Sequence, residues 1–385
     1  MLNFQFHNPV KIIFGKDAIS KIGQEIPAGS RILITYGGGS IKHNGVLDQV
    51  LAALKEFEVH QFGGIEANPT FETLMQAVAQ VKTQNIDFLL AVGGGSVIDG
   101  TKFIAAAALF DGDPWTIMEQ WGAPIKQALP LGAVLTLAAT GSEMNSGGVI
   151  TRREWKVKRP FSHPLVFPKF AALDPATTLS LPPRQVSNGI VDSFVHITEQ
   201  YLTYPVGGKV QDRLAEGLLL TLIEEGPKAL TQPDDVDVRA DLMWTSTLAL
   251  NGLIGAGVPG DWSTHMIGHE ITAAYGLDHA QTLAIVLPAL LTVKKQDKRE
   301  KLLQYAERVW GLREGSEEER IDRAIAATRS FFESLQVKTR LADYGIGAES
   351  VDHLVAQLIK NGMVKLGERR DVTPEVSRQV LQLCF

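Results

Sequence analysis

Residues 87–99 read Asp-Phe-Leu-Leu-Ala-Val-Gly-Gly-Gly-Ser-Val-Ile-Asp. The apolar run up to Val92 predicts a buried β-strand, the glycines predict a tight turn, and the alanine-rich segment that follows predicts a helix to about Leu109. A strand that passes through a glycine turn directly into a helix is typical of a parallel sheet covered by helices. This stretch therefore predicts an α/β domain.

The same alternation of strand and helix extends on both sides of this stretch. Further strands are expected at residues 11–14, 31–36, 58–62, 133–137 and 170–173, with helices at 45–54 and 71–84. Beyond Leu181 strand signals nearly vanish, and helices are expected at residues 183–201, 210–225, 238–253, 264–275, 299–309, 317–335 and 351–362. We therefore expect a Rossmann-like α/β domain with a parallel sheet at residues 1–180, followed by an all-α domain at residues 181–385.

Composition narrows the class of partner. A chain of 385 residues exceeds what one hydrophobic core usually supports, and its net charge of -6 argues against nucleic acid or an anionic membrane as the main partner. The single cysteine, Cys384, rules out a disulfide framework and a thiolate metal site. The N-terminus lacks the layout of a signal peptide, and no apolar run is long enough to span a bilayer. A cytoplasmic protein that acts on a small molecule is expected.

The glycine loop at residues 93–95 is a candidate nucleotide site. Glycines let backbone N–H groups approach a diphosphate, and the helix N-terminus favours its negative charge. Ser96 is expected to cap the helix or bind an oxygen, with Asp99 at the third helical position. The alternative is a plain turn with a good cap. Neither Gly-x-Gly-x-x-Gly nor a P-loop motif is present, so a nucleotide would bind in another way.

A second glycine loop follows Tyr36. An NAD-selective site commonly has an acidic residue at the end of such a strand, whereas this loop offers Gly38, Gly39, Ser40 and the nearby Lys42. Open amides, a hydroxyl and a cation suit a 2′-phosphate, which favours NADP(H). The alternative is a mobile surface turn. A third loop, at residues 136–145, is rich in small and hydroxylated residues that allow a ligand to approach closely.

Histidines and a carboxylate recur at helical spacing in the second half. Asp192 and His196 lie four residues apart, as do His265 and His269, and His279 is expected in the turn after the latter helix. Each feature alone is more often an ordinary packed residue. Together, one carboxylate and three histidines from these segments form an N3O set that suits Fe(II) or Zn(II) and leaves an open position for Lewis-acid catalysis.

The chain resembles the iron-containing (group III) alcohol dehydrogenases essentially from end to end. The resemblance is carried by Gly-Gly-Gly-Ser-Val-Ile-Asp at 93–99, Ala-Thr-Gly-Ser-Glu at 139–143, Asp-x3-His-x2-Glu at 192–199 and the histidines at 265, 269 and 279. Tyr-Gly-Gly-Gly-Ser at 36–40 and Gly-Leu-Asp-His-Ala-Gln-Thr-Leu-Ala at 276–284 are similar to the NADPH-dependent bacterial aldehyde reductase and butanol dehydrogenase branch. The resemblance implies the fold that this family shares with dehydroquinate synthase.

The resemblance also implies roles for particular residues. It implies a divalent metal ion, Fe2+ or Zn2+, held by Asp192, His196, His265 and His279. It implies that His269 lies near the nicotinamide without binding the metal, as a candidate proton relay, and that Lys158 lies near the nicotinamide ribose. The remaining NADP(H) contacts that it implies are Gly94, Gly95, Ser96, Asp99, Thr136, Thr140, Asn68 and Leu181.

The implied activity is the reversible, NADPH-linked reduction of aldehydes to primary alcohols by a homodimer. One alternative is a sugar-phosphate cyclase of the dehydroquinate synthase type, which needs basic residues near the metal to bind a substrate phosphate. Residues 262–288 contain no lysine or arginine, which disfavours this alternative. The other alternative is a metal-binding protein without catalytic activity.

Overall fold

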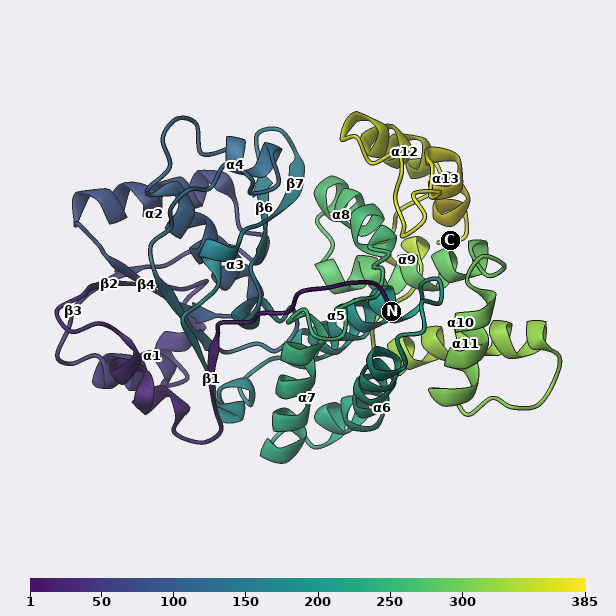
Figure 1. The fold of residues 1–385 in the computed structure, drawn as a ribbon, viewed down its shortest axis with the longest axis horizontal. Coiled ribbons are helices and arrows are strands. Elements are labelled where there is room, and N and C mark those ends of the chain that lie inside the picture. The colour runs from purple at the N-terminus through teal and green to yellow at the C-terminus, as the bar shows by residue number, and fades with distance from the viewer. The chain divides into compact units, whose positions relative to one another are not determined.

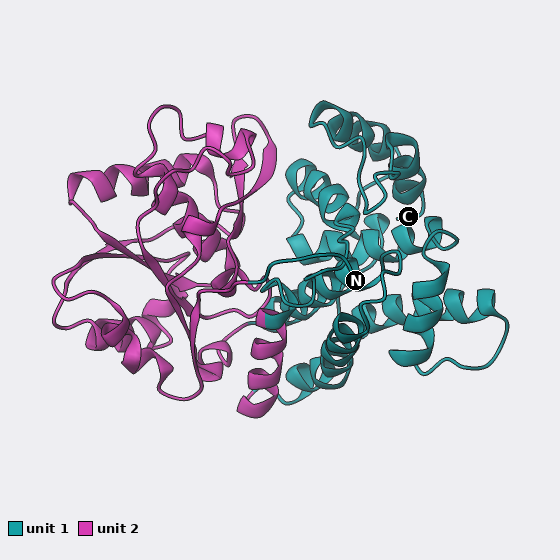
Figure 2. Ribbon diagram, in the orientation of Figure 1, with its two compact units in different colours: residues 1–6, 182–233, 248–385 teal, residues 7–181, 234–247 magenta.

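The structure is a computed structural model that describes residues 1–385 (Figure 1). Its contacts divide the chain into two compact units (Figure 2). The α/β unit comprises residues 7–181 and 234–247, and the helical unit comprises residues 1–6, 182–233 and 248–385. The units differ from the expected 1–180 and 181–385 chiefly at residues 1–6 and 234–247. Most of helix α7 (Val236–Ala249) joins the α/β unit because Met243 is buried in its core and the Thr247 hydroxyl donates to Glu143 at 2.6 Å.

The α/β unit is built on one parallel sheet, as the sequence predicts. Its strands lie in the order β1-β8-β5-β4-β2-β3. Their bounds are β1 Lys11–Phe14, β2 Arg31–Thr35, β3 Glu58–Phe62, β4 Phe88–Gly93, β5 Leu131–Leu135 and β8 Phe170–Leu173. All neighbouring strands are parallel, so their carboxyl ends share one edge. The loops after β5, β4 and β2 therefore lie side by side at that edge.

Each face of the sheet has its own apolar core. Alternate residues of β4 enter different cores, with Leu89 and Ala91 in one and Phe88, Leu90 and Val92 in the other. The helices α2 (Phe71–Thr83) and α3 (Gly95–Ala107) cover the first face, and α1 (Val46–Ala53) covers the second (Figure 1). A sheet buried on both faces explains the continuous apolar run of β4.

An antiparallel hairpin beside α3 was absent from the sequence-based expectation. Its strands are β6 (Gly147–Arg152) and β7 (Val157–Ser162), which pair along their whole length. A short helix, α4 (Thr116–Glu119), packs against β7. The hairpin strands contain glycine, proline and several charged residues, so they lack the alternation that marks a strand.

The helical unit contains no strand, in agreement with the expected all-α domain. Its helices are α5 Pro183–Tyr201, α6 Lys209–Thr231, α8 Ser263–Tyr275, α9 His279–Val293, α10 Arg299–Arg308, α11 Glu317–Ser334, α12 Ser350–Lys360 and α13 Pro374–Gln382. Helices α9 and α13 were not expected. Helix α9 packs against α5, α8, α11 and α13 and is buried on nearly every side, so it shows no amphipathic period. None of the helices in this fold has the length and apolarity needed to cross a bilayer.

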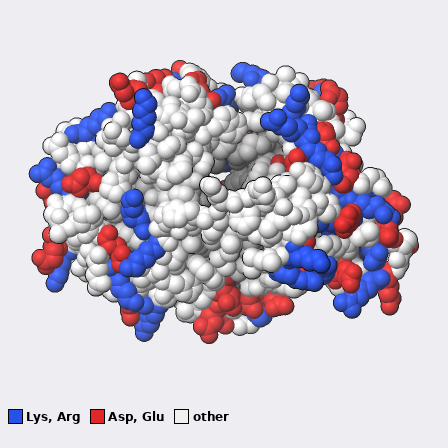
Figure 3. Space-filling model, viewed as in Figure 1, with Lys and Arg blue, Asp and Glu red and all other residues white.

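Figure 3 shows most charged side chains towards the margins of the face drawn, around a broad region without charge. Lysine and arginine lie there among aspartate and glutamate, and no single basic patch dominates the view. A face of this kind does not have the electrostatic footprint of a nucleic-acid site.

Replacing Gly132 in β5 tests the packing between β5 and β8. A Cβ atom at Gly132 would lie 2.4 Å from the ring of Phe170, so Gly132→Ala is expected to destabilise the fold by about 1–3 kcal/mol. The exposed Gly217 of α6 has no atom within 4 Å of such a Cβ, and Gly217→Ala is expected to stabilise by about 0.5–1 kcal/mol. Denaturant unfolding of both variants measures this, and equal stabilities would contradict the packing argument.

Candidate functional site

Helix α5 supplies a buried carboxylate and imidazole. Pro183 occupies the first helical position, where its missing N–H costs nothing. Asp192, His196 and Glu199 are then spaced by four and three residues, which puts them on one side of the helix. The three residues are 3%, 4% and 2% exposed. Polar side chains held this far from water require partners.

Helices α8 and α9 supply the other imidazoles. His265 and His269 lie on α8, which ends at Gly276 in the left-handed conformation (φ 72°). His279, expected in a turn, is instead the first residue of α9. The turn becomes a helix start because Asp278 and Gln281 form a reciprocal capping box.

Three imidazoles converge on one carboxylate oxygen. The Nε2 atoms of His196, His265 and His279 lie 3.6, 3.9 and 3.7 Å from Asp192 Oδ1. Metal–ligand bonds of about 2.0–2.2 Å in a tetrahedral site put neighbouring ligand atoms roughly 3.4 Å apart. The observed separations are close to this value, and the ligand atoms of Asp192, His265 and His279 all lie within 4.8 Å of one another. This set fits a metal ion.

Glu199 orients His265 from behind. Its carboxylate binds His265 Nδ1 and accepts from the backbone N–H of Thr264 at 2.7 Å. His265 Nε2 is buried and has no hydrogen-bond partner, as expected for an atom reserved for an ion. Glu199 belongs to the Asp-x3-His-x2-Glu motif, but no role was expected for it from the sequence. Its place three residues after His196 could have suggested one.

The pKa shifts in the site follow from burial and from the carboxylates. Burial lowers the pKa of His196 to about 4, so its imidazole is neutral, the form that binds a metal. Burial by itself would lower the pKa of His265, but Glu199 and Asp192 outweigh it and raise that pKa to about 9. Without an ion, His265 therefore carries the positive charge that these carboxylates attract.

His269 lies beside this cluster. Its ring centroid is 6.3 Å from that of His265 and 5.1 Å from that of His279, and its side chain is buried. The group whose ligand atoms lie within 4.8 Å of one another consists of Asp192, His265 and His279, and it includes neither His196 nor His269. What distinguishes His196 is its Nε2 atom, which lies 3.6 Å from Asp192 Oδ1, and the expected role of His269 beside the metal stays a prediction.

The glycine loops lie at the carboxyl edge of the sheet. In the loop after β2, Gly39 has a φ of 100°, Gly38 has open space around it, and Lys42 lies 4.9 Å from the centroid of the Tyr36 ring. In the loop after β4, a Cβ atom on Gly95 would lie 2.2 Å from the hydroxyl of Thr140. Gly95 therefore has to be glycine for the loops after β4 and β5 to pack together.

The expectation that Ser96 caps α3 is wrong. The helix begins at Gly95 with Gly94 at its N-cap, and the Ser96 hydroxyl donates to the carbonyl oxygen of Ala67 instead of capping. Asp99 consequently lies deeper in the helix than the third position. Its carboxylate accepts from the Ser142 hydroxyl at 2.6 Å and from Val149 N at 2.9 Å.

The other predicted cofactor residues lie in the same α/β unit. Lys158 on β7 donates to Asn68 Oδ1 at 3.0 Å, which brings two of them together. The backbone N–H of Thr136 donates to Gly93 O at 3.0 Å, next to the β4 loop. Leu181 follows Ser180, whose hydroxyl accepts from Asn44 at 3.1 Å and so ties this segment to the loop after β2.

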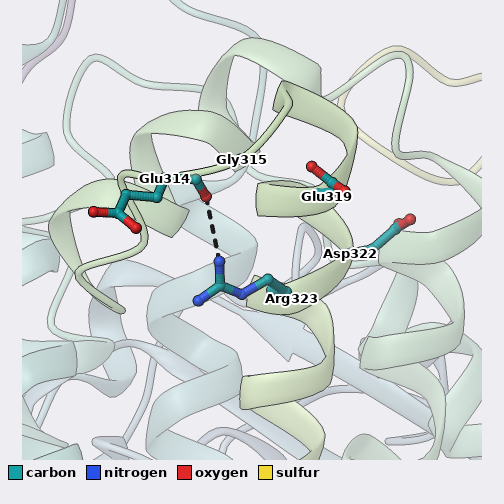
Figure 4. Close-up of a pocket in the computed structure, with 5 residues that line it drawn as sticks. All are labelled: Glu314, Gly315, Glu319, Asp322 and Arg323. Carbon is teal, nitrogen blue, oxygen red and sulfur yellow. Dashed lines mark hydrogen bonds between the residues drawn. The ribbon is translucent and has the colours of Figure 1, made fainter.

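A surface depression at the start of α11 contains none of these residues (Figure 4). It is lined by Glu314, Gly315, Glu319, Asp322 and Arg323, and Arg323 donates to the Glu314 carbonyl oxygen at 3.3 Å. The depression lies between the turn before α11 and the first turns of that helix, which this hydrogen bond joins.

Comparison with known proteins identifies the family. Residues 9–175 match the family described as "Iron-containing alcohol dehydrogenase", and residues 186–378 match "Fe-containing alcohol dehydrogenase family, C-terminal". The chain belongs to the iron-containing alcohol dehydrogenase family. The resemblance seen in the sequence is thereby confirmed.

Two relatives show how similar this family member is to others. It is 61% identical over 384 residues to the NADPH-dependent aldehyde reductase YqhD of Escherichia coli (strain K12), covering 99% of both chains. It is 44% identical over 367 residues to the probable NADH-dependent butanol dehydrogenase 1 of Bacillus subtilis (strain 168), covering 94% of this chain and 95% of that protein.

Solved structures share the fold. The crystal structure of E. coli K-12 YqhD superposes with a TM-score of 0.99 at 60% identity, covering 100% of this chain and 99% of that one. The NADH-dependent butanol dehydrogenase A of Thermotoga maritima superposes with a TM-score of 0.95 at 37% identity, with the same coverage. The expected fold class is confirmed.

Replacing His265 and His269 separately tests the division between them. His265→Ala removes an Nε2 that faces Asp192, so the variant is expected to lose most of its bound metal and its turnover while staying folded. His269→Ala is expected to keep the metal and lose only rate. Inductively coupled plasma mass spectrometry measures the metal content per chain of both variants, and circular dichroism shows whether they are folded. A metal-free His269→Ala protein would reverse the assignment.

Proposed function

We propose that this chain reduces aldehydes to primary alcohols with NADPH and one divalent metal ion. The observation that carries the proposal is the convergence of three imidazole Nε2 atoms on Asp192 Oδ1, at 3.6–3.9 Å. The name of the E. coli relative, an NADPH-dependent aldehyde reductase at 61% identity, supports the substrate class and the cofactor.

The proposed metal ligands are Asp192, His196, His265 and His279. When bound, the ion supplies Lewis acidity that polarises an aldehyde carbonyl, and NADPH supplies the hydride. Glu199 holds Nδ1 of His265 and so directs its Nε2 toward Asp192. The buried carboxylate of Asp192 would offer an anionic ligand to a divalent cation, and the ion would have to displace the proton that His265 binds in its absence.

The proposed cofactor site is the carboxyl edge of the sheet. The backbone at Gly94 and Gly95 is proposed to bind the diphosphate, which the N-terminus of α3 at these residues supports. Asp99 and Lys158 are proposed to bind ribose hydroxyls, and the imidazole of His269 to give a proton to the alcohol oxygen as it forms. The further proposed contacts are Gly38, Gly39, Ser40, Asn68, Ser96, Thr136, Thr140 and Leu181.

NADPH is proposed over NADH because of the loop after β2. Relatives of both kinds exist, since the B. subtilis relative is named NADH-dependent. In this chain the loop has no acidic residue, and it offers Ser40 together with Lys42, whose ammonium lies over the Tyr36 ring. A 2′-phosphate would find a cation here and no opposing carboxylate.

The activity itself is tested by following NADPH oxidation with butanal. The metal-loaded protein is expected to oxidise NADPH only when the aldehyde is added, and to stop after treatment with a chelator. Adding back Fe2+ or Zn2+ should restore the rate. A cyclase would show no net loss of NADPH, and a binding protein would show no turnover, so either result overturns the proposal.

Gly38→Asp tests the proposed 2′-phosphate site. A carboxylate about 4 Å from a phosphate dianion costs about 1–2 kcal/mol in water, a factor of roughly five to thirty in affinity. KM for NADPH is therefore expected to rise by that factor, while KM for NADH changes little. Gly38→Ala is the matched control, because a Cβ at this position meets no atom within 4 Å. Equal changes for the two cofactors would contradict the assignment.

We further propose that the protein is a cytoplasmic homodimer. The lone cysteine of the chain, Cys384, is buried, which suits a reducing compartment. Sedimentation velocity of the purified protein measures the oligomeric state directly.

A further inference from the structure

Lys298 is a buried cation in the helical unit that the proposed mechanism does not use. Its side chain is 2% exposed, and it lies at the N-cap of α10. All three of its N–H donors are engaged, by Asp261 Oδ2 at 2.9 Å, Glu368 Oε1 at 2.7 Å and the carbonyl oxygen of Leu202 at 2.7 Å. Burial by itself would lower the pKa of Lys298, but the two carboxylates raise it, so the amine is charged.

Two of these partners lie at the ends of the helices that carry the proposed metal ligands. Leu202 is the C-cap of α5, and Asp261 lies two residues before the start of α8. Asp261 is itself tied to both helices. Its backbone N–H donates to the Glu199 carbonyl oxygen at 2.9 Å, and its Oδ1 accepts from Ser263 N at 3.0 Å. Lys298 therefore joins the end of α5 to the start of α8.

The segment that Lys298 holds is strained and touches the metal site. Trp262, between Asp261 and Ser263, has a φ of 62°, a conformation that bulky residues rarely adopt. Its indole lies 5.5 Å from the His265 ring and 6.3 Å from the His196 ring, measured between centroids. A strained residue persists only where its surroundings hold it, and the hydrogen bonds of Asp261 do so here.

Stability alone does not account for this cluster. A buried ion pair is often no more stabilising than apolar residues of the same size, because desolvation offsets the attraction between the charges. A geometric role does account for it. The Lys298 side chain contacts the end of α5 and the segment before α8. The separation of these two segments sets how far the ligands on α5 lie from His265 on α8.

We propose that Lys298 is a positioning residue for the metal centre, which fixes the end of α5 against the strained start of α8. This inference rests on the proposed metal ligands and is independent of the substrate. The residue acts through Asp261 and Leu202 and touches neither metal nor substrate.

The test compares Lys298→Met with Lys294→Met. Lys294, one turn earlier in the chain, is also buried, and it pairs with Asp297 at 2.5 Å and Asp371 at 2.9 Å. Its substitution also removes a buried ammonium from two carboxylate partners, Asp297 and Asp371, which are 51% and 40% exposed, and neither partner is Leu202 or Asp261. Affinity for Zn2+ is measured by competition with a chelator, and ligand geometry by the visible spectrum of the Co2+-substituted proteins, both without cofactor or aldehyde.

Lys298→Met is expected to bind Zn2+ about ten- to a hundredfold more weakly, as loss of outer-shell support typically does, and to give an altered Co2+ spectrum. Lys294→Met is expected to match the parent in both. If Lys298→Met does not fold, Asp261→Asn takes its place, since it keeps the side-chain shape and removes the charge that Lys298 binds. It is expected to weaken Zn2+ binding in the same direction.

Parent-like affinity together with a parent-like Co2+ spectrum in the folded Lys298 variant, or in Asp261→Asn, overturns the inference. Equal weakening by Lys294→Met overturns it too, because the loss of any buried lysine ammonium in this region would then suffice. A parent that binds Zn2+ but reduces no aldehyde sinks the proposed activity and leaves this comparison intact. A parent that binds no metal overturns both.

Discussion

A carboxylate buried in the middle of a helix is the constraint around which the helical unit is arranged. Asp192 is 3% exposed, and a carboxylate at that depth is costly unless polar groups or cations surround it. Three imidazole nitrogens meet its Oδ1 from α5, α8 and α9. This convergence brings three helices to one point, with the proline start of α5 and the capped start of α9 setting where each ligand falls.

The proposed metal centre is supported in layers. Glu199 fixes the direction of His265 through its Nδ1, and Asp261 fixes the loop before α8. Lys298 in turn binds Asp261 and the end of α5. Outer partners of this kind orient metal ligands that could otherwise rotate. A binding site built from three helices needs such links because no single element contains more than two of the ligands.

Close backbone approach governs the α/β unit in a comparable way. Gly95 lies where a side chain would collide with Thr140, and Gly39 adopts a φ of 100°. These glycines serve the packing of the loops as well as any ligand. The two readings of the loops offered by the sequence, a tight turn and a diphosphate site, are therefore compatible. At Gly95 both interpretations require glycine, because the close approach of Thr140 leaves no room for a Cβ atom.

The sequence by itself determined the parallel sheet, the helical second half and the family. Buried strands such as β4 are continuous apolar runs, and motifs at 93–99 and 192–199 have fixed local spacing, so both can be read without knowing the fold. The hairpin of β6 and β7 was not predicted from the sequence, because it is held by packing on α3 and has no apolar pattern. Lys158 meets Asn68 only through that hairpin.

Tertiary structure alone decided the contacts between distant segments. The start of α9 at His279, the membership of α7 in the α/β unit, and the roles of Glu199 and Lys298 all depend on side chains far apart in the chain. Lys298 and Leu202 are 96 residues apart, and no local period relates them. Hydrogen bonds between such residues follow from how the helices pack, and packing depends on the shape of every buried side chain at once.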